Sequence, residues 1–445
     1  MSLKLLQGDW PHVPVAKVYG RLIRVNGLVL EAVGCQLGMG DRCQIEGRNG
    51  RLIEAEVVGF NKDVLCLMPI EPTQGLMPGA RVIPMTEVRT VAVGDGLLGR
   101  VLDGLGQPLD LFGKLSGVTQ QLPSHSSYNP LLRRPITQAL DVGIRAINSL
   151  LPVGRGQRLG LFAGSGVGKS MLLGMMTRFT EADVVVVGLI GERGREVREF
   201  IEQTLGEEGR KRAVVIAAPA DTTPLMRLRA MVLSHEIACA FRDQGKHVLL
   251  LVDSLTRYAQ AQREIALSLG EPPATKGYPP SAFAQLPRLV EMAGNGEHPV
   301  GTLTAFYTVL TEGDDQQDPV ADAARAILDG HVVLSRKLAE QGHFPAIDIN
   351  ASVSRLATQV ATGDQLAQSQ VIRHLLSRYS EVRELLPLGG YQQGQDLEMD
   401  LAVRHYGDMA AFLKQRTDEN IDLPSSLTQL AQLMDVMGYE PQTPR

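Results

Sequence analysis

The stretch from residue 163 to residue 170 reads Ala163-Gly164-Ser165-Gly166-Val167-Gly168-Lys169-Ser170. An apolar run precedes it and a helix-forming run follows it, the setting in which a glycine-rich turn holds a phosphate group. Backbone N–H groups of such a turn face the phosphate oxygens, and the N-terminus of the following helix adds a partial positive charge. Lys169 can reach the β and γ phosphates, and the Ser170 hydroxyl can hold Mg²⁺. The stretch therefore predicts a nucleoside triphosphate site.

Two other interpretations of this stretch are weaker. An ordinary glycine-rich turn between a strand and a helix would not need the Gly-Lys-Ser sequence in this context. A dinucleotide-binding G-x-G-x-x-G pattern fails because Lys169 stands where the third glycine would be. The first position of the phosphate-loop pattern is Ala163 rather than glycine, a mild change if its φ is negative.

Apolar runs alternate with longer helical segments from residue 91 to residue 358. We expect strands at 157–162, 183–189, 213–218, 248–252 and 301–310, and helices at 169–180, 196–205, 223–244 and 254–269. Such alternation builds a multi-domain α/β protein around a parallel sheet with helices on both faces. Ligands bind beyond the carboxyl ends of parallel strands. Small, acidic or hydroxyl residues follow each expected strand, so we expect one shared crevice there.

Asp253 directly follows the apolar run 248–252. A carboxylate at the end of a buried strand, beside a phosphate loop, is placed to hold a water of the Mg²⁺ shell. Taken alone, Asp253 could equally be the N-cap of the helix that starts after it. The phosphate loop favours the metal role.

Glu192 follows the run 183–189 and stands next to Arg193. A carboxylate at this position can orient and polarise the water that attacks the γ-phosphate. The alternative is a first-turn acid that the helix dipole favours. We count Glu192 and Arg193 among the candidate catalytic residues, and Glu192 distinguishes a working ATPase from a subunit that only binds nucleotide.

The segment Pro345-Ala346-Ile347-Asp348-Ile349-Asn350-Ala351-Ser352-Val353-Ser354-Arg355 ends in an arginine. Phosphoryl transfer gains from an arginine beside the developing charge, by roughly 10³–10⁵ in rate. Because Arg355 lies far along the chain, it could reach such a site from a neighbouring subunit. A plain salt bridge is the alternative.

The two flanks of the alternating region differ from it. Residues 1–90 contain short β-type runs separated by Gly, Asn and Asp, which predicts a small barrel or sandwich with a structural or assembly role. Residues 359–445 contain polar amphipathic helical stretches, which predict a helical third domain.

Composition excludes several classes of protein. The net charge of the 445 residues is −5 and no basic block occurs, which argues against nucleic acid as a partner. The four cysteines form no CxxC or Cys/His pair, which favours reduced thiols in the cytosol. The longest apolar runs are far shorter than the roughly 18 residues of a membrane-spanning helix. We expect a cytoplasmic protein, which could still work at a membrane as a peripheral subunit.

Together, 163–170, 191–196, 248–253 and 345–355 resemble the rotary ATPase α/β-subunit superfamily. Segment 345–354 fits its P-A-I-D-x-x-x-S-x-S signature throughout. Within the superfamily, the chain resembles the flagellar and type III secretion export ATPases. That narrower match rests on GEPPATKGYPPS at 270–281 and TEGDDQQDP at 311–319, and extends over nearly the whole chain.

The resemblance implies an N-terminal β-barrel (1–90), a RecA-like ATPase domain (91–358) and a C-terminal helical domain (359–445). It implies a homohexamer with ATP and Mg²⁺ between subunits. Lys169 and Ser170 would bind phosphate and Mg²⁺, Glu192 would activate water, and Arg355 would act in trans. Phe344 matches the aromatic residue that stacks on adenine, with a core phenylalanine as the alternative, and Tyr391 resembles a second adenine-side contact.

The implied function is that of a motor subunit that hydrolyses ATP to release, unfold and export flagellar substrates. The implied partners are a stator-like regulatory protein, a stalk protein, substrate–chaperone complexes and the membrane export gate, with which the protein would be in peripheral contact. The run 312–316 favours the flagellar form over the virulence (injectisome) form. A non-catalytic rotary subunit and a ring-shaped RNA helicase are the alternatives from other classes; Glu192 opposes the first, and the aromatic-poor, near-neutral barrel opposes the second.

Overall fold

The structure is a computed structural model that describes residues 18–85, 89–123, 129–297, 301–311, 318–385, 390–394 and 396–438. It contains two compact units, one of residues 1–88 with 268–270 and one of the remaining residues. The second unit holds both the predicted ATPase domain and the predicted C-terminal helices, and the three-domain limits given above stay a prediction. The run 312–316 lies outside the described residues.

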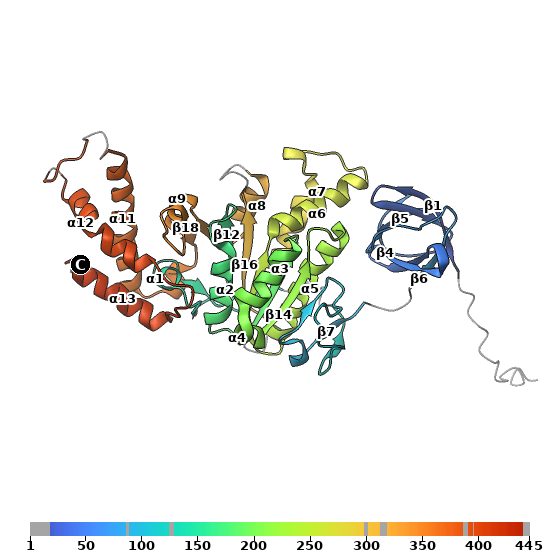
Figure 1. Ribbon diagram of the computed structural model, residues 1–445, viewed down its shortest axis with the longest axis horizontal. Helices are drawn as coiled ribbons and strands as arrows, with labels where there is room; N and C mark the ends of the chain where they lie inside the picture. Colours follow the sequence, from blue (N-terminus) through green and yellow to red (C-terminus); the bar gives the residue numbers. More distant parts are fainter. Residues whose placement is uncertain are drawn as a thin grey trace, which may run out of the picture. The chain divides into compact units, whose positions relative to one another are not determined.

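The first unit is a closed barrel with the strand order β1-β2-β5-β4-β3-β6 (Figure 1). Its strands are β1 (Gly20–Asn26), β2 (Val29–Val33), β3 (Arg42–Glu46), β4 (Leu52–Asn61), β5 (Val64–Pro69) and β6 (Arg81–Pro84). Every neighbouring pair is antiparallel, and the pairing of Gly20 with Val82 closes the ring. Apolar side chains such as Leu30 and Leu67 fill the interior. The predicted small barrel is confirmed.

The second unit is built on an eight-stranded sheet with the order β18-β17-β12-β16-β15-β13-β14-β8. Its strands are β8 (Val101–Leu102), β12 (Arg158–Ala163), β13 (Val184–Ile190), β14 (Ala213–Ala218), β15 (His247–Asp253), β16 (Thr302–Leu310), β17 (Gly330–Leu334) and β18 (Ile347–Ser354). All pairs are parallel except β17 with β18. The predicted parallel sheet is confirmed, and its five expected strands form its centre.

Helices cover both faces of this sheet because its strands are apolar on both sides. Alternate residues of β13 enter different cores: Val185 lies in one and Val186 in the other. One core includes side chains of α1 (Arg145–Leu150), α2 (Lys169–Phe179), α11 (Gly363–Leu385), α12 (Leu397–Leu413) and α13 (Leu423–Val436). The other includes side chains of α5 (Pro224–Asp243), α6 (Leu255–Ser268), α7 (Pro280–Val290) and α8 (Pro319–Ile327).

The helices α11, α12 and α13 gather at one end of this unit, beside α1 (Figure 1). Arg145 of α1 joins them: its guanidinium donates to the carbonyl oxygens of Phe412 and Ala411 at the end of α12 and to the side chain of Gln429 on α13. The helical character predicted for the C-terminal part is confirmed.

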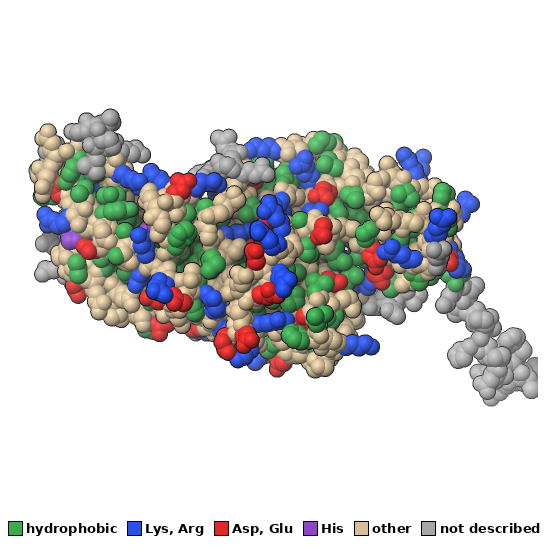
Figure 2. Space-filling view, viewed as in Figure 1, with side chains coloured by type: hydrophobic (Ala, Val, Ile, Leu, Met, Phe, Trp, Pro, Cys, Tyr) green, Lys and Arg blue, Asp and Glu red, His purple; other side chains and the backbone are tan. Residues whose placement is uncertain are grey.

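The predicted helix 196–205 is only partly right. The chain forms α3 (Gly194–Glu199), then a π-helical turn (Phe200–Leu205), then α4 (Gly206–Lys211). Thr204 in the π turn packs against α2 so closely that a Cβ on Gly174 would lie 2.1 Å from its methyl carbon. Tertiary contact with the phosphate-loop helix therefore accompanies the departure from α-helix, which the sequence pattern does not encode. Exposed basic and acidic side chains alternate over this region (Figure 2), including the Arg195–Glu199 ion pair.

Candidate active site

The glycine-rich turn connects the carboxyl end of β12 to α2. Gly166 and Gly168 have φ values of +77° and +90°, which L-residues with a side chain rarely adopt. Val167 between them is buried and anchors the turn in the core. Ala163 is the last residue of β12 and is also buried, so alanine at the first position of the pattern fits a strand end. The turn therefore has the backbone that a phosphate loop requires.

Lys169, the first residue of α2, lies between two carboxylates. Its Nζ is 2.6 Å from Oδ1 of Asp253 and 3.5 Å from Oε1 of Glu192, and all three side chains are largely buried. Burial lowers the pKa of Lys169, but the attraction of Asp253 and Glu192 outweighs that effect and leaves its pKa above the usual value. The structure thus brings together three residues that are far apart in the sequence.

Glu192 lies just beyond the carboxyl end of β13. Burial and the charge of Asp253 raise the pKa of its carboxyl to about 7, against the opposing pull of Lys169. A carboxyl group whose pKa is near the working pH is suited to accept a proton from water.

Asp253, the last residue of β15, has a second partner. The Thr308 hydroxyl, on the neighbouring strand β16, donates to Oδ1 of Asp253 at 2.7 Å. Thr308 is not among the site residues predicted from the sequence. The strand Thr302–Leu310 contains three threonines, so its sequence gives no signal that singles out Thr308.

The residues present fit a magnesium ion bound together with a nucleotide. Mg²⁺ usually takes one or two protein oxygens and completes its shell with phosphate and water. Asp253 supplies a buried carboxylate at the sheet edge, and Ser170 supplies an exposed hydroxyl in the first turn of α2. Both are hard oxygen donors of the kind that Mg²⁺ prefers.

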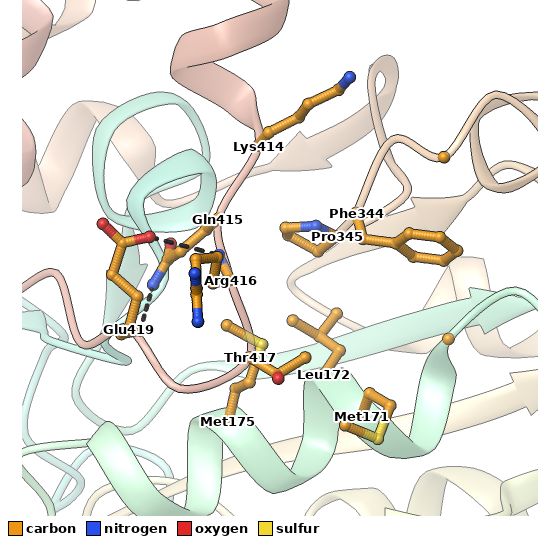
Figure 3. Close-up of a pocket in the computed structure, with 12 residues that line it drawn as sticks. Met171, Leu172, Met175, Phe344, Pro345, Lys414, Gln415, Arg416, Thr417 and Glu419 are labelled. Atoms are coloured by element: carbon orange, nitrogen blue, oxygen red, sulfur yellow. Dashed lines mark hydrogen bonds between the residues drawn. The ribbon is translucent and has the colours of Figure 1, made fainter.

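A cavity of about 510 Å³ adjoins the phosphate loop. Figure 3 shows Phe344 and Pro345 on one side of it, Met171, Leu172 and Met175 along α2, and residues 414–419 on the opposite side. Phe344 is 43% exposed, and a Cβ on Gly168 would lie 3.4 Å from its ring. An exposed aromatic ring beside a phosphate loop is a surface for stacking a nucleobase, and it is not the core phenylalanine of the alternative interpretation.

The segment 414–419, between α12 and α13, was not predicted as part of the site. It is held against Phe344 by a hydrogen bond from the backbone N–H of Gln415 to the carbonyl oxygen of Phe344, at 3.0 Å. The buried Gln415 side chain also donates to the carbonyl oxygens of Gly143 (2.8 Å) and Glu419 (2.9 Å). The contacts with Phe344 and Gly143 join distant parts of the chain, and local sequence patterns do not reveal them.

Arg193 and Arg355 are exposed and do not line this cavity. Arg193 pairs with Glu196 at 3.3 Å, one helical turn away. Arg355 follows the end of β18, and its guanidinium donates to the carbonyl oxygen of Arg325 at 2.9 Å. The structure therefore leaves the Arg355 guanidinium at the surface of the subunit.

Tyr391 lies away from the cavity described above. Its hydroxyl donates to Oδ1 of Asp400 on α12 at 2.6 Å, and it is not among the residues that line the cavity. The structure thus brings Phe344, but not Tyr391, to the phosphate loop.

Three family models match the chain. The ATP synthase alpha/beta family matches with its beta-barrel domain over residues 22–86 and its nucleotide-binding domain over residues 143–354. The T3SS EscN ATPase C-terminal domain matches residues 361–432. The chain is 58% identical to the "Flagellum-specific ATP synthase" of Pseudomonas aeruginosa over 427 residues, covering 95% of this chain and 94% of that protein.

The chain belongs to the flagellar and type III secretion ATPases of the ATP synthase alpha/beta family.

Other members of this ATPase family are also similar. The "Flagellum-specific ATP synthase" of Salmonella typhimurium is 56% identical, over 94% of each chain. The "Type 3 secretion system ATPase" of Xanthomonas euvesicatoria is 44% identical, over 97% of each chain. The assembled ATPase EscN of enteropathogenic E. coli superposes with a TM-score of 0.88 at 39% identity, covering 93% of this chain and 99% of EscN.

These similarities confirm the predicted family, fold class and enzyme class: the protein is an ATPase, and its substrate is a nucleotide. In the part of the chain that the structure describes, no helix has the length and apolar character needed to cross a membrane.

Proposed function

We propose that this chain is the ATP-hydrolysing motor subunit of a flagellar protein export apparatus, which energises release, unfolding and export of flagellar substrates. The observation that carries the proposal is the position of Lys169 between Asp253 and Glu192, at the carboxyl edge of the sheet and beside the Phe344 cavity. The relatives named flagellum-specific, at 58% and 56% identity, support the flagellar assignment.

In this proposal the triphosphate lies against residues 163–170 and the adenine stacks on Phe344. Lys169 balances the charge of the β and γ phosphates. Mg²⁺, held by Ser170 and through water by Asp253, would neutralise charge that develops on the phosphate oxygens. Glu192 accepts a proton from water as the water oxygen bonds to the γ-phosphorus. The bond between that phosphorus and the β–γ bridging oxygen breaks, and ADP and phosphate result.

We further propose that the site is completed by Arg355 of a neighbouring subunit in a homohexamer. Arg355 is exposed and does not line the cavity of its own chain, so its guanidinium is available to a second copy. The similar EscN structure is of an assembled ATPase, which supports this arrangement. Arg193 is also exposed, and in this proposal its positive charge lies near the γ-phosphate.

The proposed partners follow from the same relatives. A second EscN structure holds its central stalk EscO and superposes on this chain with a TM-score of 0.85, which supports a stalk protein as a partner here. A stator-like regulatory protein, substrate–chaperone complexes and the membrane export gate complete the proposal, with the ATPase in the cytoplasm and in peripheral contact with that gate. Nucleic acid is not a proposed partner.

The test is the ATPase rate per subunit as a function of protein concentration. If sites are shared between chains, turnover per subunit rises as rings form, and Arg355→Ala abolishes the rise while leaving the binding of a fluorescent ATP analogue intact. Arg195→Ala, which changes another exposed arginine with a surface ion pair, serves as the control and keeps the rise. A rate per subunit that does not depend on concentration in the assembling range contradicts the shared site.

The ATPase of a virulence secretion system is the second candidate. The match of residues 361–432 to the EscN C-terminal domain and the 44% identity to a type 3 secretion ATPase favour it. Deletion of the gene separates the two: loss of flagellin secretion with normal secretion of effector proteins supports the flagellar role, and the reverse result overturns it.

A further inference from the structure

The strand β16 lies between the strand that leads into the phosphate loop and the strand that ends at Asp253. It pairs with β12 on one side and with β15 on the other, both in parallel. In this register Leu161 of β12 is opposite Thr308, and Val252 of β15 is opposite Tyr307. Asp253 is the residue after Val252, and Thr308 is the residue after Tyr307. Because the two strands run parallel, Thr308 and Asp253 are therefore neighbours across the pair.

The contact between Thr308 and Asp253 is fully enclosed. Thr308 is 0% exposed and Asp253 is 4% exposed. The Thr308 hydroxyl donates to Oδ1 of Asp253, and Lys169 Nζ donates to the same atom. Among the described residues, no hydrogen bond ends on Oδ2. One oxygen of the carboxylate is thus fixed by protein donors, and the other carries no bond to the described part of the chain.

The two donors to Oδ1 differ in how freely they move. Lys169 has a long side chain whose ammonium is also the group that phosphate oxygens attract. Thr308 is β-branched, sits in a strand and has a single stiff side-chain torsion. When Lys169 turns to a phosphate, the Thr308 hydroxyl is the donor that stays.

We propose that Thr308 is a positioning residue for Asp253: its hydroxyl holds Oδ1 so that Oδ2 keeps one orientation toward the shell of the metal ion while Lys169 binds phosphate. This inference rests on the proposed function, in which Asp253 orders the Mg²⁺ shell. It assigns a role to a strand, β16, that contributes no residue to the site predicted from the sequence.

Another threonine on the same strand offers a matched comparison. Thr304 is also buried and, four residues earlier, lies on the same face of β16, but its hydroxyl bonds only to backbone, accepting from Gly156 N and donating to the Gly154 carbonyl oxygen. Replacing either threonine with valine keeps the branched shape and removes a buried hydroxyl. Only the change at Thr308 removes a donor to Asp253.

The experiment compares Thr308→Val, Thr308→Ser and Thr304→Val in the full chain. The first readout is the Mg²⁺ concentration that gives half-maximal ATPase activity. The second is Mn²⁺ binding with ADP, followed by electron paramagnetic resonance, and the third is binding of a fluorescent ADP analogue in EDTA. Thr308→Ala, a smaller change, replaces Thr308→Val if the valine variant does not fold.

We expect Thr308→Val to raise the half-saturating Mg²⁺ and Mn²⁺ concentrations about tenfold, because a hydrogen bond to a charged group is lost. Nucleotide binding in EDTA stays unchanged, and Thr308→Ser restores metal dependence to within about twofold of the original chain. The inference is overturned if the metal dependence does not move, if Thr304→Val moves it equally, or if binding in EDTA falls by the same factor.

Asp253→Asn separates this inference from the function on which it rests. If Asp253→Asn weakens metal binding and Thr308→Val does not, the metal role of Asp253 stands and the positioning role of Thr308 fails. If Asp253→Asn itself leaves the metal dependence unchanged, the proposed metal site is wrong.

Discussion

The Nζ atom of Lys169 lies 2.6 Å from Oδ1 of Asp253. The contact joins the first residue of α2, the helix that follows the phosphate loop, to the last residue of β15. A triphosphate attracts the same ammonium group, so nucleotide binding exchanges one anionic partner of Lys169 for another. Asp253 and Glu192 hold the pKa of Lys169 above its usual value, so Lys169 is charged before the nucleotide binds.

Glu192→Gln is expected to lower the ATPase turnover rate by about 10²-fold or more, because the amide cannot accept a proton from water. Nucleotide binding stays within a few-fold of the original. Phosphate release and titration with a fluorescent ATP analogue measure the two effects. Glu202→Gln, in the exposed pair with Arg198, is the control and keeps the turnover rate. Unchanged turnover in Glu192→Gln would show that the carboxylate is not the base.

Phe344→Ala is expected to weaken ATP binding by about tenfold or more, since stacking of a base on an aromatic ring is worth roughly 1–3 kcal/mol. Phe344→Tyr keeps the ring and retains the affinity. Equilibrium titration with a fluorescent ATP analogue is the measurement. Phe112→Ala removes another exposed aromatic ring, one that packs under Arg210 and does not line the cavity, and leaves affinity unchanged.

Gln415→Leu is expected to destabilise the protein by about 2 kcal/mol, because the side-chain amide of Gln415 no longer donates to the carbonyl oxygens of Gly143 and Glu419 or accepts from the backbone N–H of Arg145. The substitution also weakens ATP binding, because residues 414–419 lose the side-chain hydrogen bonds that hold them beside Phe344. Urea unfolding and nucleotide titration measure the two effects. Gln429→Leu removes one bond from Arg145 and no contact with the cavity, so it reduces stability alone.

Stability is expected to fall in mild acid because of His235. Burial lowers the pKa of this fully enclosed imidazole to about 4. Its Nδ1–H donates to the Met231 carbonyl oxygen, and its Nε2 accepts from the Tyr307 hydroxyl, so the folded protein holds it neutral. In the unfolded chain, His235 binds a proton as the pH falls below about 6.5, whereas in the folded protein it stays neutral until about pH 4. The free energy of unfolding therefore falls by up to about 3 kcal/mol as the pH is lowered to 4.

Urea unfolding at pH 7.5 and at pH 5 tests whether the free energy of unfolding falls as the pH is lowered. The free energy of unfolding should be lower at pH 5 by about 2 kcal/mol through this group alone. His235→Gln, although less stable at pH 7.5, should lose that part of the pH dependence. His374→Gln, an exposed histidine beside Glu398, is the control and should keep it.

The sequence predicted that Lys169, Glu192 and Asp253 gather at the carboxyl end of the sheet, because the signals for this are local. The glycines at 166 and 168, the lysine after them and the acid at the end of an apolar run each follow from backbone or charge requirements that a short stretch displays. Likewise, uninterrupted apolar runs such as Val184–Ile190 predicted strands covered on both faces.

What the sequence did not predict depends on contacts between distant residues. Gly168 and Gln415 both line the cavity although 247 positions separate them in the sequence, and no periodic pattern reveals this. The same holds for the pairing of Thr308 with Asp253. The strand β17 (Gly330–Leu334) was not predicted, because it begins with Gly and His and its apolar run has only three residues. Those positions are fixed only when the sheet and the helices pack together.

One wall of the nucleotide cavity, residues 414–419, is also the connection between two helices of the C-terminal group. If a partner protein displaced α12, this segment would move with it, because Lys414 directly follows the helix. The hydrogen bond from Gln415 N–H to the Phe344 carbonyl oxygen would carry the displacement to the other side of the cavity. Under the proposed function, a protein bound at the C-terminal helices would therefore change the space beside Phe344, and with it the rate at which ADP leaves.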